Sequence, residues 1–184
     1  MSLIKKFRNC RSEKLEKAAR AAAKIGIRAD HVTGLSLFSG ILAIYFLFSS
    51  YYAFAAFAML HLICDGFDGV VARVTKPTRP GKYFDLLTDS TVAFIALAKV
   101  AWRLQEPYAF IAAGLYFIAL LIHLRSRLQA PMTFMRTASI IVLVIATHPL
   151  FPYTDIILTA GYLTAGGVSL FSLARQLQWR MQHG

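Results

Sequence analysis

Long apolar stretches separated by short polar segments run along the chain from about residue 32 to residue 174. Each is close to the roughly 20 residues that a helix needs to cross the hydrocarbon core of a bilayer. The six candidate spans are about Val32–Ser50, Tyr51–Val71, Phe84–Trp102, Tyr108–Leu124, Thr133–Thr147 and Ile156–Ala174. Almost no loop separates the first two spans, so we expect a tight hairpin there. The pattern predicts an all-α membrane protein with six transmembrane helices.

The segment before the first span has a different, amphipathic pattern. In "SEKLEKAARAAAKIGI", Leu15, Ala18 and Ile25 share one helical face opposite lysines and arginines, with Ser12 as a suitable N-cap. Such a helix is expected to lie along the membrane interface. No repeat or low-complexity linker divides the rest of the chain. We therefore expect an interfacial segment over residues 1–30 and a single transmembrane domain over 31–184.

Composition agrees with a membrane protein, since 57% of the 184 residues are hydrophobic and only 16% are charged. The net charge of +11 raises the question of nucleic-acid binding. However, eighteen of the twenty lysines and arginines lie before the first span, in the loop between the second and third spans, after the fourth or after the sixth. Lys99 and Arg103 are the exceptions. This distribution follows the positive-inside rule, and basic residues there also attract anionic lipids.

The charge distribution sets the expected orientation. Both termini and the loop between the second and third spans should face the cytoplasm. The protein is expected in a prokaryotic cytoplasmic membrane, with membrane lipids and no nucleic acid among its partners.

Acidic residues cluster where the second span ends and the third begins. Of nine in the chain, four fall within 25 positions: Asp65, Asp68, Asp85 and Asp89. Spacings of three and four residues put each pair on one helix face, and the loop between them reverses the chain. We therefore expect the four carboxylates to converge. An aspartate at the centre of a membrane helix costs about 2.5 to 3.5 kcal/mol, so something cationic must offset them.

Divalent cations explain this cluster best. Carboxylate oxygens suit Mg²⁺ or Mn²⁺, and four carboxylates would balance two divalent ions. Two-metal sites stabilise phosphate oxygens during in-line displacement. The alternative is a salt-bridged helix hairpin, in which nearby basic residues neutralise the aspartates. Those residues are Arg73, Lys76, Arg79 and Lys82.

Small residues accompany the acids. Gly66, Gly69 and Ala72 leave one stripe of this helix with little side chain, where a ligand can lie flat, although such stripes also serve helix packing in lipid. Arg73 offers a planar donor fork for phosphate. Gly81 allows the loop to pass close to a ligand.

The stretch "DGFDGVVARVTKPTRPGKYFDLLTD" resembles the signature of the CDP-alcohol phosphotransferase family, which is an Asp-x2-Asp-Gly-x2-Ala-Arg run followed by Gly-x3-Asp-x3-Asp. Its eight positions are filled by Asp65, Asp68, Gly69, Ala72, Arg73, Gly81, Asp85 and Asp89. The six spans and the interfacial helix also resemble the family. The similarity implies a homodimeric enzyme of phospholipid synthesis. Such an enzyme transfers a phosphatidyl-type group from a CDP-linked lipid, CDP-diacylglycerol or CDP-archaeol, to a small hydroxylated acceptor and releases CMP.

The resemblance also implies residue roles. Asp65, Asp68 and Asp85 would be metal ligands, and Asp89 would contact the second ion and act as general base on the acceptor hydroxyl. The nucleotide would lie along the glycine-bearing stripe. Its binding residues would be Asp65, Gly69, Ala72, Arg73, Gly81 and Thr33.

Acceptor binding is the least defined part of the site. Three arginines around the fourth-to-fifth loop, Arg125, Arg127 and Arg136, are candidates for an acceptor phosphate, with positive-inside anchoring as the alternative. His123 is either a proton carrier or an interfacial histidine. Asp30 and Ser36 stand where glycerophosphate-type members often have Asn and Arg, so the acceptor stays open.

Two further functions remain as alternatives. Within the family, some enzymes use a soluble CDP-alcohol donor and a lipid acceptor, and the signature does not separate the two. From another class, a small ion transporter would also place acids in membrane helices. A transporter would more often carry them near the midplane and in repeated halves.

Overall fold

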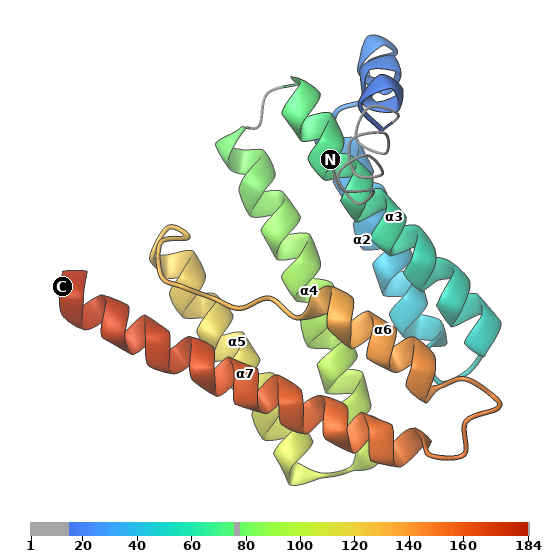
Figure 1. The fold of residues 1–184 in the computed structure, drawn as a ribbon, viewed down its shortest axis with the longest axis vertical. Helices are drawn as coiled ribbons and strands as arrows, with labels where there is room; N and C mark the ends of the chain where they lie inside the picture. The colour runs from blue at the N-terminus through green and yellow to red at the C-terminus, as the bar shows by residue number, and fades with distance from the viewer. Residues whose placement is uncertain (1–14, 76–77, 184) are drawn as a thin grey trace, which may run out of the picture. The chain divides into compact units, whose positions relative to one another are not determined.

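The computed structural model describes residues 15–75 and 78–183, and all regular secondary structure in that part of the chain is helical (Figure 1). Residues 15–24 are helical, whereas the expected cap at Ser12 lies outside the described residues. The helices that follow are α2 (Ala29–Phe46), α3 (Tyr51–Thr75), α4 (Arg79–Leu104), α5 (Pro107–Arg125), α6 (Arg136–Ala146) and α7 (Thr154–His183). The predicted all-α class is confirmed.

Local sequence explains where several helices begin and end. The turn between α2 and α3 spans only residues 47–50, and the Ser50 amide donates to the Phe46 carbonyl at 3.0 Å. This is the tight hairpin that the sequence predicted. Pro107 stands at the start of α5, where the missing amide hydrogen costs nothing and the fixed φ suits the first turn.

Within residues 15–75 and 78–183, four helices are long and apolar enough to cross a membrane, namely α2, α3, α5 and α7, whereas the sequence predicted six spans. The expected span Phe84–Trp102 lies within α4, whose 26 residues include Asp85, Asp89 and Lys99. The expected span Thr133–Thr147 is represented by α6, which begins only at Arg136 and has 11 residues. That helix is about 16 Å long, roughly half the thickness of the hydrocarbon core. The apolar helices make the chain a membrane protein.

The chain divides into two compact units. The first comprises Met1–Ala43 and Ala56–Asp89, and in it α2 and α3 run side by side (Figure 1). A small core is formed by Val70 and Val71, near the end of α3, and by Ala19 of the preceding helical segment. The single transmembrane domain expected over 31–184 stays a prediction.

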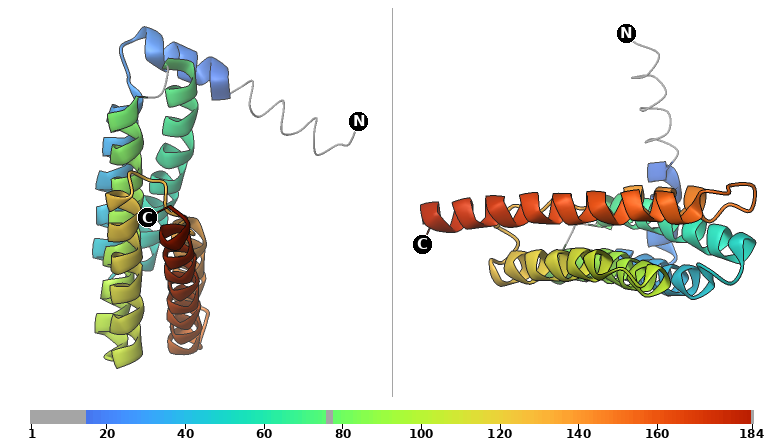
Figure 2. Two further views of the ribbon diagram at one scale, coloured as in Figure 1. Left: turned by 90° about the vertical axis from the view of Figure 1, so that its left-hand side faces the viewer. Right: turned by 90° about the horizontal axis from the view of Figure 1, so that it is seen from below.

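The second unit comprises Ile44–Ala55 and Ser90–Gly184. In it α5 packs along α7, as both views of Figure 2 show, and α6 also contacts α7. The α5 face turned inward is mostly alanine, and the Gln176 side chain donates from Nε2 to the Ala119 carbonyl at 2.9 Å. Small side chains let these helices approach closely.

Candidate metal centre and its cavity

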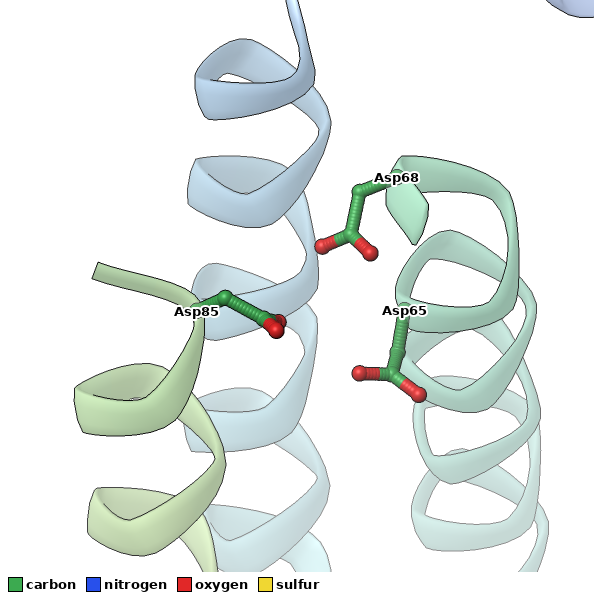
Figure 3. Close-up of side chains that lie close together, drawn as sticks. All are labelled: Asp65, Asp68 and Asp85. Carbon is green, nitrogen blue, oxygen red and sulfur yellow. The ribbon is translucent and has the colours of Figure 1, made fainter. Parts of the chain in front are cut away.

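Three aspartates of the first unit converge. Asp65 and Asp68 come from α3 and Asp85 from α4, and their carboxylates point toward one another (Figure 3). Each offers an oxygen, and these oxygens all lie within 4.8 Å of one another. The Asp68 side chain is buried and the other two are half-buried. The structure thus brings together three of the four predicted metal ligands.

Three carboxylates in this arrangement fit a divalent cation. Carboxylates so close together repel one another strongly where water is scarce. Magnesium binds oxygen at about 2.1 Å, which places ligand oxygens about 3 to 4 Å apart in an octahedral shell. The described group is near that spacing and is made only of hard oxygen donors. The cluster can therefore hold Mg²⁺ or Mn²⁺.

Asp89 lies one helical turn beyond Asp85 on the same face of α4 and is half-buried. The group of three mutually close carboxylates does not include it. Its roles as a ligand of a second ion and as general base remain predictions. The position on the face of Asp85 is what those roles require.

Two buried hydrogen-bonded pairs join α2 to α3 beside the cluster. Thr33 Oγ1 donates to Asp68 Oδ2 at 2.8 Å, so this threonine contacts a predicted metal ligand directly. One turn along α2, Ser36 Oγ lies 2.9 Å from Nδ1 of the fully buried His61. His61 was not among the residues predicted for the site. The signal for it was its position one helical turn before Asp65.

A cavity of about 460 Å³ opens in the first unit beside the acids. Of the predicted site residues, it is lined by Thr33, Asp68, Gly69, Ala72, Gly81 and Asp85. Arg73 is exposed and is not among the lining residues. The cavity is also lined by five polar residues that residue spacing did not predict as part of the site: Arg28, Asp30, Thr75, Thr78 and Lys82. Cations and carboxylates therefore share one cavity.

The glycines of this cavity are in contrasting surroundings. A Cβ built on Gly69 would meet nothing within 4 Å, so the open side of α3 predicted for the nucleotide stripe is open space. A Cβ on Gly81 would lie 3.0 Å from Thr78 Oγ1 and 3.1 Å from Asp30 Oδ1. Gly81 therefore permits the close approach of Asp30 to the first turn of α4.

The three candidate acceptor arginines belong to the second unit. Arg125 ends α5 and Arg127 follows in the turn with a φ of 55°, and both side chains are exposed. Arg136 begins α6 and is half-buried.

His123 has a structural contact in the same turn. Its Nδ1 donates to the Ala130 carbonyl at 2.6 Å, and the ring packs edge-on against Phe134. The Ser126 hydroxyl bonds the His123 carbonyl at 2.7 Å. These contacts order the turn after α5, which accounts for a buried histidine without proton transfer.

Comparison with known proteins gives two individual likenesses. The chain is 31% identical over 117 residues to the inner membrane protein YnjF of Escherichia coli (strain K12), a match that covers 57% of this chain and 56% of that protein. The chain thus spans little more than half of that relative's length. The fold is similar to that of Mycobacterium tuberculosis phosphatidylinositol phosphate synthase (PgsA1), solved with CDP-DAG bound. The TM-score is 0.65 at 18% identity, and the match covers 89% of this chain and 92% of that one.

The family comparison covers most of the chain. The model of the CDP-alcohol phosphatidyltransferase family matches residues 27–170, which include the three clustered aspartates and every residue of the signature. The family suggested by the aspartate and glycine spacing is thereby confirmed, and this chain belongs to the CDP-alcohol phosphatidyltransferase family.

Proposed function

We propose that the protein transfers a phosphatidyl-type group from a CDP-linked lipid, CDP-diacylglycerol or CDP-archaeol, to the hydroxyl of a small polar acceptor and releases CMP. One observation carries this proposal, the group of three carboxylates whose oxygens lie within 4.8 Å of one another. Two of these carboxylates line a cavity of about 460 Å³, which is also lined by glycines and by cationic residues. A diphosphate ester needs a metal-binding group, room for a nucleoside and a passage for the acceptor. The family assignment supports the same reaction.

Asp65, Asp68 and Asp85 would hold one divalent ion, and Asp89 would complete a site for a second. When bound, Mg²⁺ or Mn²⁺ neutralises charge on the diphosphate oxygens and on the departing CMP. The chain's own contribution is to keep the ligand oxygens in place. Thr33 does this for Asp68, because its hydroxyl donates to one carboxylate oxygen and fixes the orientation of the other.

Asp89 would take the proton of the acceptor hydroxyl. The acceptor oxygen then forms a bond to the phosphorus that carries the lipid, and the bond from that phosphorus to the CMP oxygen breaks. CMP leaves as an ionised phosphate, so the leaving group needs no proton from the enzyme. The reaction requires no covalent enzyme intermediate.

The nucleotide would lie against the open side of α3 at Gly69 and Ala72, with Asp65, Thr33 and Gly81 around it. Arg73 would hold a phosphate from the rim, since its side chain is exposed. Absence of a side chain at Gly69 leaves open space for a flat ring system. The same surface would accept a soluble CDP-alcohol. Only an assay of both donors distinguishes an enzyme that uses a CDP-linked lipid from one that uses a soluble CDP-alcohol.

Acceptor recognition has two sets of candidate cations. Arg125, Arg127 and Arg136 are the residues proposed from the sequence. Arg28 and Lys82 line the cavity itself, and we add them as residues that would attract an acceptor bearing its own phosphate.

We further propose a six-span architecture in a prokaryotic cytoplasmic membrane, with both termini and the active site facing the cytoplasm and the protein acting as a homodimer. In this arrangement α4 would span as a helix whose charged residues face protein, and α6 would be completed by flanking residues. The predominance of lysine and arginine in the expected cytoplasmic segments supports the orientation.

The test is CMP release by the detergent-purified protein. CDP-diacylglycerol and Mg²⁺ or Mn²⁺ are combined in turn with glycerol 3-phosphate, inositol 1-phosphate, serine, inositol and phosphatidylglycerol. We expect metal-dependent CMP with one acceptor. The assay is repeated with CDP-archaeol if no acceptor responds to CDP-diacylglycerol. If neither lipid donor releases CMP, but a soluble CDP-alcohol does so with a lipid acceptor, the donor assignment is wrong. Silence with every donor would contradict the proposed enzyme function.

A further inference from the structure

Two basic residues, Lys99 and Arg103, fall outside the segments in which positive charge is expected, and both lie near the end of α4. Lys99 has a structural role. Its Nζ donates to the carbonyls of Ile44 at 2.5 Å and Tyr45 at 2.8 Å, in the last turn of α2. Carbonyls there lack donors within their own helix and carry the negative end of its dipole. These bonds give Lys99 a structural role. They leave Arg103 as the residue of this pair whose role is still to be explained.

Arg103 lines a cavity of about 240 Å³ in the second unit. The other lining residues come from the α2–α3 turn and from the ends of α6 and α7: Leu47, Phe48, Ser49, Ser50, Tyr51, Thr147 and Thr154. Its guanidinium carbon lies 5.9 Å from the centre of the Phe48 ring, which supports the side chain from one side. No carboxylate lines the cavity, and among the described residues no ion pair engages Arg103.

Four of the eight lining residues carry an aliphatic hydroxyl, and two of these remain available as donors. The Thr147 hydroxyl already donates to the Leu143 carbonyl at 2.7 Å. The Ser49 hydroxyl donates to the Phe46 carbonyl at a longer distance of 3.4 Å. In the described part of the chain the hydroxyls of Ser50 and Thr154 make no hydrogen bond. A guanidinium and free hydroxyls without a carboxylate are the donor set of an oxyanion site.

We propose that this cavity binds a phosphate group, with Arg103 as the anion-binding residue and Ser50 and Thr154 as hydroxyl donors. The first amides of α3 and α7 stand beside these hydroxyls and strengthen the preference for an anion. The phosphate belongs either to the headgroup of an anionic lipid or to a free phosphate ion. On the topology expected from the sequence, this end of the helices faces away from the cytoplasm. The site uses no residue of the first unit, so it is independent of the proposed transferase function.

The test is isothermal titration of the full-length protein in phosphate-free detergent buffer with EDTA. The ligands are inorganic phosphate and, separately, dihexanoyl phosphatidylglycerol below its micelle concentration. We expect binding that Arg103→Gln weakens at least tenfold and Thr154→Val weakens several-fold. Arg180→Gln removes an exposed arginine of α7 outside the cavity and should leave the affinity unchanged. Unchanged thermal unfolding of each variant shows that its fold is intact.

The ligand arms distinguish the two sources. If the short-chain lipid binds more tightly than phosphate, the cavity is a headgroup site. If only inorganic phosphate binds, it is a free-anion site. Either outcome supports the proposal. Wild-type affinity of Arg103→Gln for both ligands would overturn it, as would absence of binding to the wild type. Equal losses in Arg103→Gln and Arg180→Gln would overturn it in favour of a general charge effect. A loss confined to Lys82→Gln would move the bound anion to the larger cavity and would also overturn it.

Discussion

The helix pair α2–α3 in the first unit and the pair α5–α7 in the second are joined by different means. Buried polar pairs link α2 to α3, namely Thr33 with Asp68 and Ser36 with His61. By contrast, α5 packs on α7 chiefly through alanines, and a Cβ on Gly166 of α7 would lie 3.3 Å from the Ala112 side chain. Close packing of small residues is enough to hold two helices together in lipid.

The difference shows where polar groups serve more than assembly. A buried hydroxyl or imidazole costs free energy unless it is paired, and α5 packs on α7 chiefly through small apolar side chains, with the Gln176 amide as a polar link. We therefore propose that the α2–α3 pairs serve the acids that they flank, by fixing the rotation of α3 that presents Asp68. Changes in the first contact should alter activity and metal binding, whereas comparable changes in the second should alter at most stability.

The largest effect is expected from Asp85→Asn. Loss of one carboxylate from the group of three removes a metal ligand and its charge, so turnover should fall at least about a thousandfold. Mn²⁺ binding, followed by electron paramagnetic resonance, should be lost as well. Asp155→Asn removes an exposed acid of α7 and is the matched control. Mn²⁺ affinity equal to that of the wild type would remove Asp85 from the metal centre.

Asp89→Asn should separate chemistry from metal binding. A general base contributes roughly 10² to 10⁴ in rate, so CMP release should fall by about that factor. Mn²⁺ affinity at the three-carboxylate group should stay within a few-fold of the wild type. Retained turnover in this variant would exclude Asp89 as the base.

Gly69→Leu tests the nucleotide stripe. A Cβ at this position meets nothing within 4 Å, so we expect thermal stability not to fall, while the rest of the leucine side chain should occupy the room proposed for the nucleotide. We expect the KM for the CDP-linked donor to rise by about 10- to 100-fold. Gly66→Leu is the control, because that position also has nothing within 4 Å and does not line the cavity. Equal KM values for the two variants would place the nucleotide elsewhere.

Thr33→Val tests the support of Asp68 by α2. Removal of the 2.8 Å donor frees the carboxylate to rotate, and loss of such a partner typically costs about 10-fold or more in metal affinity. Thr33→Ser keeps the hydroxyl and should restore most of the Mn²⁺ affinity and turnover. If valine and serine behave alike, the hydroxyl does not position Asp68.

The smallest effect is expected in the second unit. Gln176 is buried, and its single described side-chain bond goes to a carbonyl within α5. Gln176→Leu removes that bond together with an amide oxygen that is costly to bury, so stability should change by only about 1 kcal/mol. Thermal unfolding in detergent measures this change, and CMP release should match the wild type. A large loss of activity would show that α5–α7 is not merely a packing contact.

Sequence alone determined the class of the protein and the identity of its acids. Hydropathy and helical periodicity are local properties, so the helices α2, α3, α5 and α7 and the faces that carry Asp65, Asp68 and Asp85 follow from residue spacing. The family signature is likewise a matter of spacing along the chain. These predictions needed no knowledge of how one helix is rotated against another.

The tertiary structure decided which of these groups meet. It brought three aspartates together rather than four, set Thr33 against Asp68 and paired Ser36 with His61. It also placed Arg28 and Lys82 in the cavity, and it left α6 with only 11 residues. Each outcome depends on helix rotation, on side-chain rotamers and on where a helix gives way to a turn. Contacts between distant segments set these features, so residue spacing alone could not provide them.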